Sequence, residues 1–231
     1  MEESNVEQTE RVDPEGALAL LMEGNMRFVQ GALQHPHASV GWRRALLAGQ
    51  RPFAAVASCS DSRVSPEILF DRGLGDLFVV RTAGHVLGEA GIASLEYAVL
   101  HLHVPLIIVL GHAECGAVHA ALARADALPG HLSHLARAIA PAIGWVLEEA
   151  RRTGEEKAER AAEQAMQEAL DSAESAPRFV AHNRVAQLHA RLTAEALPVE
   201  SSVIRERVAQ GSLRVQAAYY ELDCGKVDLL D

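Results

Sequence analysis

The sequence is poor in cysteine, with three among 231 residues. An odd and small number of cysteines argues against a disulfide framework, and it leaves reduced thiols that could bind a metal ion. No apolar run approaches the roughly 20 residues that a membrane-spanning helix needs. The first residues, Met1 to Asn5, lack a positive segment followed by an apolar stretch, which argues against a secretory signal. A cytoplasmic protein that does not bind a membrane is therefore expected.

Clusters of basic residues are lacking as well. The formal net charge is −10, and the pairs Arg43–Arg44 and Arg151–Arg152 are too short to form a basic patch. Such a chain is a poor candidate for binding nucleic acid. Apolar residues make up 49% of the chain, so a folded globular protein is expected. The length suits one domain, placed at residues 13–231 after a polar tail, residues 1–12, that is predicted to be disordered.

Short apolar runs alternate with helical patterns along the chain. Strands are predicted at residues 53–57, 77–80, 106–110, 213–217 and 226–229. Helices are predicted at residues 13–31, 39–49 and 89–102. This order predicts an α/β fold with a mostly parallel central β-sheet, an antiparallel edge strand and flanking helices. A charged stretch at about residues 145–175 is predicted to be a solvated helix or helix pair of unknown role.

Two short segments with metal-binding residues follow predicted buried strands. The first contains Cys59, Asp61 and Arg63, and the second contains His112 and Cys115. If the two strands are neighbours, both loops face one crevice at the carboxyl edge of the sheet, where α/β proteins bind ligands. Two cysteines and one histidine are a known zinc ligand set that leaves a fourth position open for water. The sequence therefore predicts a catalytic zinc site.

Asp61 and Arg63 are well placed to assist such a site. Two thiolates cancel the formal charge of the ion, so bound water would be acidified less than by three neutral histidines. A carboxylate near that water can accept its hydrogen bond, and a guanidinium can hold the carboxylate ionised and off the metal. If the pair broke, Asp61 could become the fourth metal ligand and close the site.

Each of these residues also has an ordinary interpretation. A lone cysteine after a strand is commonly a small buried apolar residue, and an isolated Asp-x-Arg is commonly a surface ion pair. Cys224 is expected to have no role in the site. His85 follows the second strand and could line the crevice. The other histidines are expected to have ordinary structural positions: His101, His103, His119, His131, His134, His182 and His189.

Together, the two segments resemble the signature of the β-class carbonic anhydrases. Residues 80–84 and 94–99 resemble further family segments, and the resemblance covers the chain from about residue 14 to its end. It implies one Zn²⁺ per chain, with Cys59, His112 and Cys115 as ligands and Asp61 and Arg63 as the family's dyad. It also implies a homodimer, or a tetramer built as a dimer of dimers, with the N-terminal helices packing on the partner.

The resemblance further implies residues that bind substrate. Gln50 matches a glutamine that donates a hydrogen bond to substrate oxygen, and Phe78 and Tyr97 match apolar walls of the CO₂ pocket that are contributed across the dimer interface. A backbone amide near Gly116 would stabilise the developing negative oxygen. The reaction implied is reversible hydration of CO₂ to bicarbonate and a proton by hydroxide that zinc generates.

One departure concerns the subgroup to which the chain belongs. The bicarbonate-inhibited subgroup has a tryptophan where this chain has Val56, although Arg81 and Tyr220 resemble that subgroup's other bicarbonate contacts. The plant-like, open-site behaviour of some bacterial members is therefore expected. Two alternatives stay open: hydrolysis of carbonyl sulfide or carbon disulfide on the same zinc site, and a non-catalytic binding or sensing protein with structural zinc. In the second case, Asp61→Asn would change nothing.

Overall fold

A computed structural model describes residues 12–124, 128–152 and 176–231. Five strands form one sheet, in the order β2–β1–β3–β4–β5. Their bounds are β1 Ala54–Cys59, β2 Leu77–Thr82, β3 Leu106–His112, β4 Arg214–Tyr220 and β5 Val227–Leu230. The first four strands pair in parallel, and β5 pairs with β4 antiparallel. The predicted α/β fold, with a mostly parallel sheet and an antiparallel edge strand, is confirmed.

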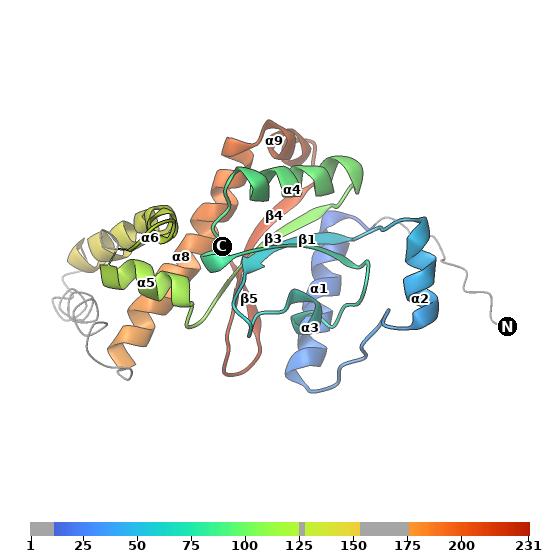
Figure 1. The fold of residues 1–231 in the computed structure, drawn as a ribbon, viewed down its shortest axis with the longest axis horizontal. Helices are drawn as coiled ribbons and strands as arrows, with labels where there is room; N and C mark the ends of the chain where they lie inside the picture. Colours follow the sequence, from blue (N-terminus) through green and yellow to red (C-terminus); the bar gives the residue numbers. More distant parts are fainter. Residues whose placement is uncertain (1–11, 125–127, 153–175) are drawn as a thin grey trace.

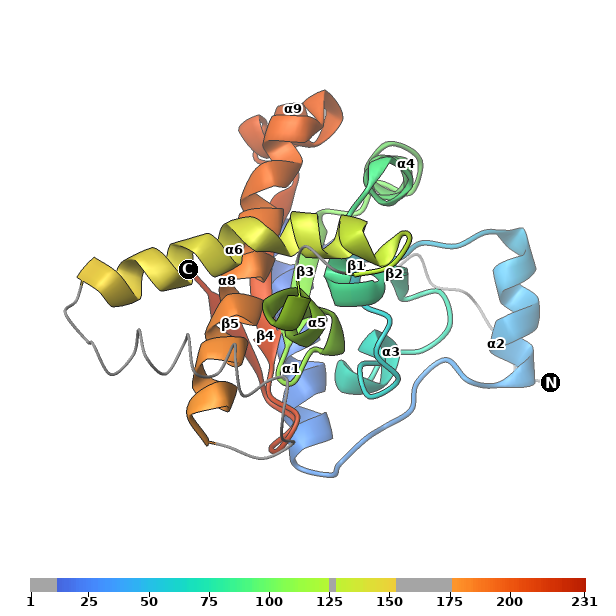
Figure 2. The ribbon, with the colours of Figure 1, turned by 60° about the vertical axis from the view of Figure 1, so that its left-hand side comes forward.

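Helices cover both faces of this sheet (Figures 1 and 2). Their bounds are α1 Pro14–Val29, α2 Val40–Ala45, η1 Leu46–Ala48, α3 Pro66–Leu69, η2 Ala83–His85, α4 Glu89–His101, α5 Gly116–Arg124, α6 Leu132–Arg152, α8 Ala176–Glu200 and α9 Ser202–Ala209. Helices α1 and α3 pack on one face, and α4, α8 and α9 on the other. A third apolar cluster joins α5, α6 and α8 near the carboxyl edge of the strands.

The strands alternate side chains between the two covered faces. In β1, Ala54 and Val56 belong to the cluster under α1, while Ala55 and Ala57 belong to the cluster under α4 and α8. All six residues of β1 and all seven of β3 are buried. This explains why both strands are continuous apolar runs in the sequence, as expected for parallel strands covered on both sides.

The N-terminal helices differ in how they contact the body. Helix α1 begins as predicted, with the side chain of Asp13 accepting a hydrogen bond from the Gly16 N–H at 2.7 Å. Helix α2 has no buried residue and projects from the body in Figure 1. Its anchor is Trp42, which donates to the Leu74 carbonyl at 2.8 Å and stacks on His37. Packing of these helices on a partner stays a prediction.

Parts of the predicted organisation lie outside the described residues. These are residues 1–11 of the expected tail and residues 153–175 of the charged stretch, whereas residues 145–152 belong to α6. The division into a tail and a single domain therefore stays a prediction. No helix in the described part of the chain is long and apolar enough to span a bilayer.

Candidate metal centre

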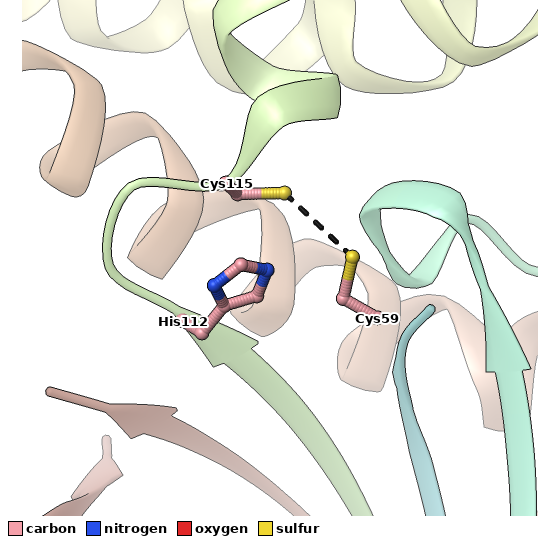
Figure 3. Close-up of side chains that lie close together, drawn as sticks. All are labelled: Cys59, His112 and Cys115. Atoms are coloured by element: carbon pink, nitrogen blue, oxygen red, sulfur yellow. Dashed lines mark hydrogen bonds between the residues drawn. The ribbon is translucent and has the colours of Figure 1, made fainter. Parts of the chain in front are cut away.

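The topology places the two predicted loops side by side. Strands β1 and β3 are parallel neighbours, with Ser58 paired to Leu110. Cys59 is the last residue of β1 and His112 the last residue of β3, so both leave the sheet at its carboxyl edge. Cys115 follows in the turn that leads into α5. Figure 3 shows the three side chains converging on one point.

The distances fit a zinc ion. The Sγ atoms of Cys59 and Cys115 are 4.0 Å apart, and one ligand atom from each of the three residues lies within 4.8 Å of the others. Zinc–sulfur bonds of about 2.3 Å at a tetrahedral angle would separate two sulfur atoms by roughly 3.8 Å. All three side chains are buried. The described residues hold no other group of three such side chains close enough to bind a metal.

His112 is fixed in the form that a metal ligand requires. Its Nδ1 lies 2.7 Å from the carbonyl oxygen of Ala113, to which the Nδ1–H donates. The lone pair is then on Nε2, which is buried without a hydrogen-bond partner among the described residues. Metal-binding histidines are commonly oriented by such a bond from the second ring nitrogen. The orphaned Nε2 is therefore the atom that would bind the ion.

Backbone N–H groups surround both sulfur atoms. Cys59 Sγ accepts from Gly84 at 3.2 Å and from Asp61 at 3.4 Å, and Cys115 accepts from the first turn of α5. The hydrogen bond between the two thiols lowers the pKa of Cys59 to about 4 and, together with burial, raises that of Cys115. One thiolate is thus favoured in this pair, and a bound cation would displace the remaining proton.

Asp61 and Arg63 form a bidentate pair beside the ligands. Arg63 donates from Nε and Nη2 to the two carboxylate oxygens at 2.9 and 2.8 Å, and its backbone N–H donates at 3.0 Å. These hydrogen bonds lower the pKa of Asp61 to about 2. Arg63 Nη2 also donates to the Glu114 carbonyl at 3.0 Å, which ties the first loop to the second. The carboxylate is therefore ionised and held by the guanidinium.

Arg81 supports the first loop in a way that the sequence did not indicate. Its guanidinium donates to the carbonyl oxygens of Cys59 at 3.0 Å and Asp61 at 2.7 Å. The side chain thus contacts the backbone of the ligand loop. Every residue has a backbone carbonyl, so the sequence pattern cannot show which carbonyls Arg81 binds. The contact becomes visible only from the parallel pairing of β1 with β2.

Three of the predicted substrate-binding residues lie far from this centre within one chain. Phe78 pairs with Ala55, four residues before Cys59 on β1, which corresponds to about 13 Å of strand. The ring of Tyr97 is 6.3 Å from the ring of Phe78, and Gln50 is exposed just before β1. All three lie toward the amino edge of the parallel strands. Gly116 begins α5, directly after Cys115, with open space beside its Cα.

Two histidines lie behind the ligand cluster. His85 and His189 are both buried, and their ring centroids are 4.6 Å apart. The sequence pointed to His85 from its place after β2, but it gave no reason to single out His189. Their separation of about a hundred positions in the chain explains this, because only the packing of α8 against the sheet brings them together.

Comparisons with known proteins agree with this geometry. A family model described as carbonic anhydrase matches residues 54–227. Carbonic anhydrase 2 of Mycobacterium tuberculosis is 44% identical over 222 residues, covering 95% of this chain and 94% of the relative. The carbonic anhydrase of Pseudomonas aeruginosa is 35% identical over 220 residues, covering 91% and 86%. This chain belongs to the β-carbonic anhydrase family.

Solved β-carbonic anhydrases share the fold. The enzyme CafA of Aspergillus fumigatus superposes with a TM-score of 0.62 at 26% identity, covering 94% of this chain and 90% of that one. A tetrameric β-carbonic anhydrase of Sordaria macrospora gives 0.61 at 26% identity, with coverage of 94% and 95%. Membership of the β-carbonic anhydrase family makes this chain an enzyme, and its Cys–His–Cys cluster is a group of side chains that could hold a metal ion.

Proposed function

We propose that this chain catalyses the reversible hydration of CO₂ to bicarbonate and a proton, with one Zn²⁺ per chain held by Cys59, His112 and Cys115. The observation that carries the proposal is the donor set. Two thiol sulfurs 4.0 Å apart and an imidazole with a free, buried Nε2 match zinc in number, spacing and chemistry. Three protein ligands leave one tetrahedral position for water, as in catalytic sites rather than structural ones.

When bound, the ion would supply the Lewis acidity that lowers the pKa of a water molecule at the open position. The carboxylate of Asp61 would accept a hydrogen bond from that water and orient it toward CO₂. Arg63 holds both carboxylate oxygens and so keeps Asp61 away from the metal. This pairing supports the open state of the site, which is the state expected of the plant-like subgroup.

The rest of the substrate pocket would come from a second copy of the chain. Gln50, Phe78 and Tyr97 lie toward the amino edge of the strands, whereas the ligands lie at the carboxyl edge. Tyr97 is 49% exposed in the single chain, so its ring is accessible to a second copy. A homodimer, or a tetramer of two dimers, would bring these residues of one chain to the metal of the other.

In this arrangement Phe78 and Tyr97 would form an apolar wall for CO₂, and Gln50 would donate a hydrogen bond to a substrate oxygen. The backbone N–H of Gly116, at the start of α5, would stabilise the oxygen that becomes negative. We place the reaction in the cytoplasm, where thiols stay reduced and free to bind zinc.

The test is stopped-flow CO₂ hydration across pH 6 to 9, with the zinc content of the same sample measured. Activity that rises with pH at about one zinc per chain supports the proposal. Asp61→Asn should keep the zinc and lose about 10²-fold in kcat/KM. Asp228→Asn is the matched control, because this half-buried carboxylate of β5 pairs with Lys226 and its loss should leave activity unchanged.

Two other outcomes would contradict the proposal. Full zinc occupancy without hydration at any pH would leave hydrolysis of carbonyl sulfide or carbon disulfide, which an assay on those substrates would detect. Unchanged properties of Asp61→Asn would indicate a non-catalytic protein with structural zinc.

A further inference from the structure

The turn after β2 has an unusual backbone. Two consecutive residues of η2, Gly84 and His85, have φ angles of +63° and +47°. Glycine adopts this left-handed region freely, but histidine does so at some cost. The side chain of His85 is fully buried. A residue held in such a conformation needs support from its surroundings, so the contacts of His85 should reveal what the turn is for.

The support for His85 is a second buried histidine. Its ring lies against the ring of His189 on α8, with centroids 4.6 Å apart and planes tilted by 34°. Neither ring nitrogen of His85, nor Nε2 of His189, has a hydrogen-bond partner among the described residues. Burial holds the pKa of His85 well below its usual value, so its ring is neutral. The ring of His85 is therefore held by packing rather than by hydrogen bonds.

Gly84 connects this histidine pair to the metal centre. Its N–H donates to Cys59 Sγ at 3.2 Å. A hydrogen bond also joins its backbone to His189, and this bond raises the pKa of His189 against the effect of burial, as expected for a ring N–H that donates to the Gly84 carbonyl. The donor is assigned to Nδ1, because Nε2 has no partner in the described residues.

The Cα of Gly84 is also confined. A Cβ atom at Gly84 would lie 2.9 Å from the Cβ of Ala117, in the first turn of α5. Gly84 thus contacts both α5 and the His85–His189 pair. Its N–H cannot turn away from Cys59 unless one of these contacts is lost.

We propose that His85 and His189 are positioning residues for the metal centre, because their stack holds the Gly84 N–H on the sulfur of Cys59. This inference rests on the proposed function, since it assumes that Cys59 binds the metal. An N–H···S hydrogen bond withdraws negative charge from a metal-bound thiolate and makes it a weaker donor. With two thiolates in the ligand set, this withdrawal leaves more positive charge on the ion to polarise water.

The experiment uses Co²⁺ in place of zinc, because its sulfur-to-metal charge-transfer absorption reports the charge on the thiolate ligands independently of catalysis. His189→Leu removes the hydrogen bond and the ring stack, so the charge-transfer band should move to lower energy at full cobalt loading. His189→Asn places an amide N–H near the position of Nδ1 and should restore the band of the unmodified protein. His134→Leu, an exposed histidine on α6, is the control and should leave the band unchanged.

A second variant keeps the test decisive if His189→Leu does not fold. His85→Asn retains a residue type that accepts the left-handed backbone but removes the ring stack, and it should also shift the band to lower energy. A band that stays in place in both His85→Asn and His189→Leu, at full loading, overturns the inference. The absence of any thiolate charge-transfer band in the unmodified protein would instead contradict the proposed metal site itself.

Discussion

The carboxyl and amino edges of the parallel strands differ in how far their side chains are enclosed within one chain. At the carboxyl edge, Cys59, His112 and Cys115 are buried and oriented by backbone groups. At the amino edge, Tyr97 and its ring neighbour His101, 4.9 Å away, face the outside. Under the proposed function, one edge holds all three metal ligands within one chain, and the other is a surface that a second copy would complete. The chain thus separates metal chemistry, which needs exact ligand geometry, from substrate enclosure, which assembly can supply.

Among the changes that test this comparison, removing one metal ligand should have the largest effect on zinc content and activity. Cys115→Ser should bring zinc content and CO₂ hydration close to background, because a hydroxyl is a poor ligand for zinc and the remaining cysteine and histidine bind weakly. Metal analysis and stopped-flow assays on the same sample measure both. Cys224→Ser is the matched control, since this exposed cysteine lies outside the cluster and should change neither value. Normal zinc content in Cys115→Ser would disprove the ligand set.

Mixed assemblies should test whether the two edges meet between chains. Cys59→Ser disables the carboxyl edge, and the double variant Gln50→Ala/Tyr97→Ala disables the amino edge. If each site combines one edge from each chain, a mixed dimer has one site with every change and one site with none. Coexpression of the two variants should then recover about a quarter of normal activity, because half of the dimers are mixed. Activity equal to the mean of the separate variants would mean that each chain builds its own pocket.

Sequence reasoning was better at locating the carboxyl edge than at explaining what supports it. The apolar runs of β1 and β3 are strong signals of buried strands, and Cys59 and His112 follow directly where those runs stop. The supports were not predictable in this way. The side chain of Arg81 binds a backbone carbonyl, and Gly84 donates its own backbone N–H, and both kinds of backbone group occur in almost every residue. His189 reaches the site only because α8 packs on the sheet.

The long helices α6 and α8 were also difficult to predict from the sequence. Helices α6 and α8 contain Pro141 and Pro198, which ordinarily weaken a helix prediction. In α8 the buried residues are mostly small, such as Ala186, Ala190 and Ala194, and give only a faint apolar stripe. Packing rather than local propensity fixes these helices, with α8 against the sheet and α6 against α5 and α8, so a single sequence gives little indication of them.

A smaller effect is expected from adding one methyl group behind the metal centre. Gly84→Ala should lower the free energy of unfolding by about 1–3 kcal/mol, because the φ angle of +63° disfavours alanine and the new Cβ would crowd Ala117. Urea unfolding of the metal-free protein measures this. Gly88→Ala is the control at the start of α4, where φ is −96° and no atom lies within 4 Å of the new Cβ. Equal stability of the two variants would show that the turn after β2 can relax.

The last effect appears only at acidic pH and concerns how stability depends on pH. Burial lowers the pKa of His189 from 6.5 to about 4, so between these values the unfolded chain binds a proton that the folded chain does not. Stability from this group is therefore complete above pH 6.5 and is lost as the pH falls toward 4, at up to about 1.4 kcal/mol per pH unit. In His189→Asn, urea unfolding of the metal-free protein at pH 6.5 and pH 4.5 should show a smaller loss than in the unmodified protein. His134→Asn, at an exposed position of α6, is the control and should leave the loss unchanged. An equal loss in all three proteins would mean that water reaches the histidine pair, and the two edges would then no longer differ in burial.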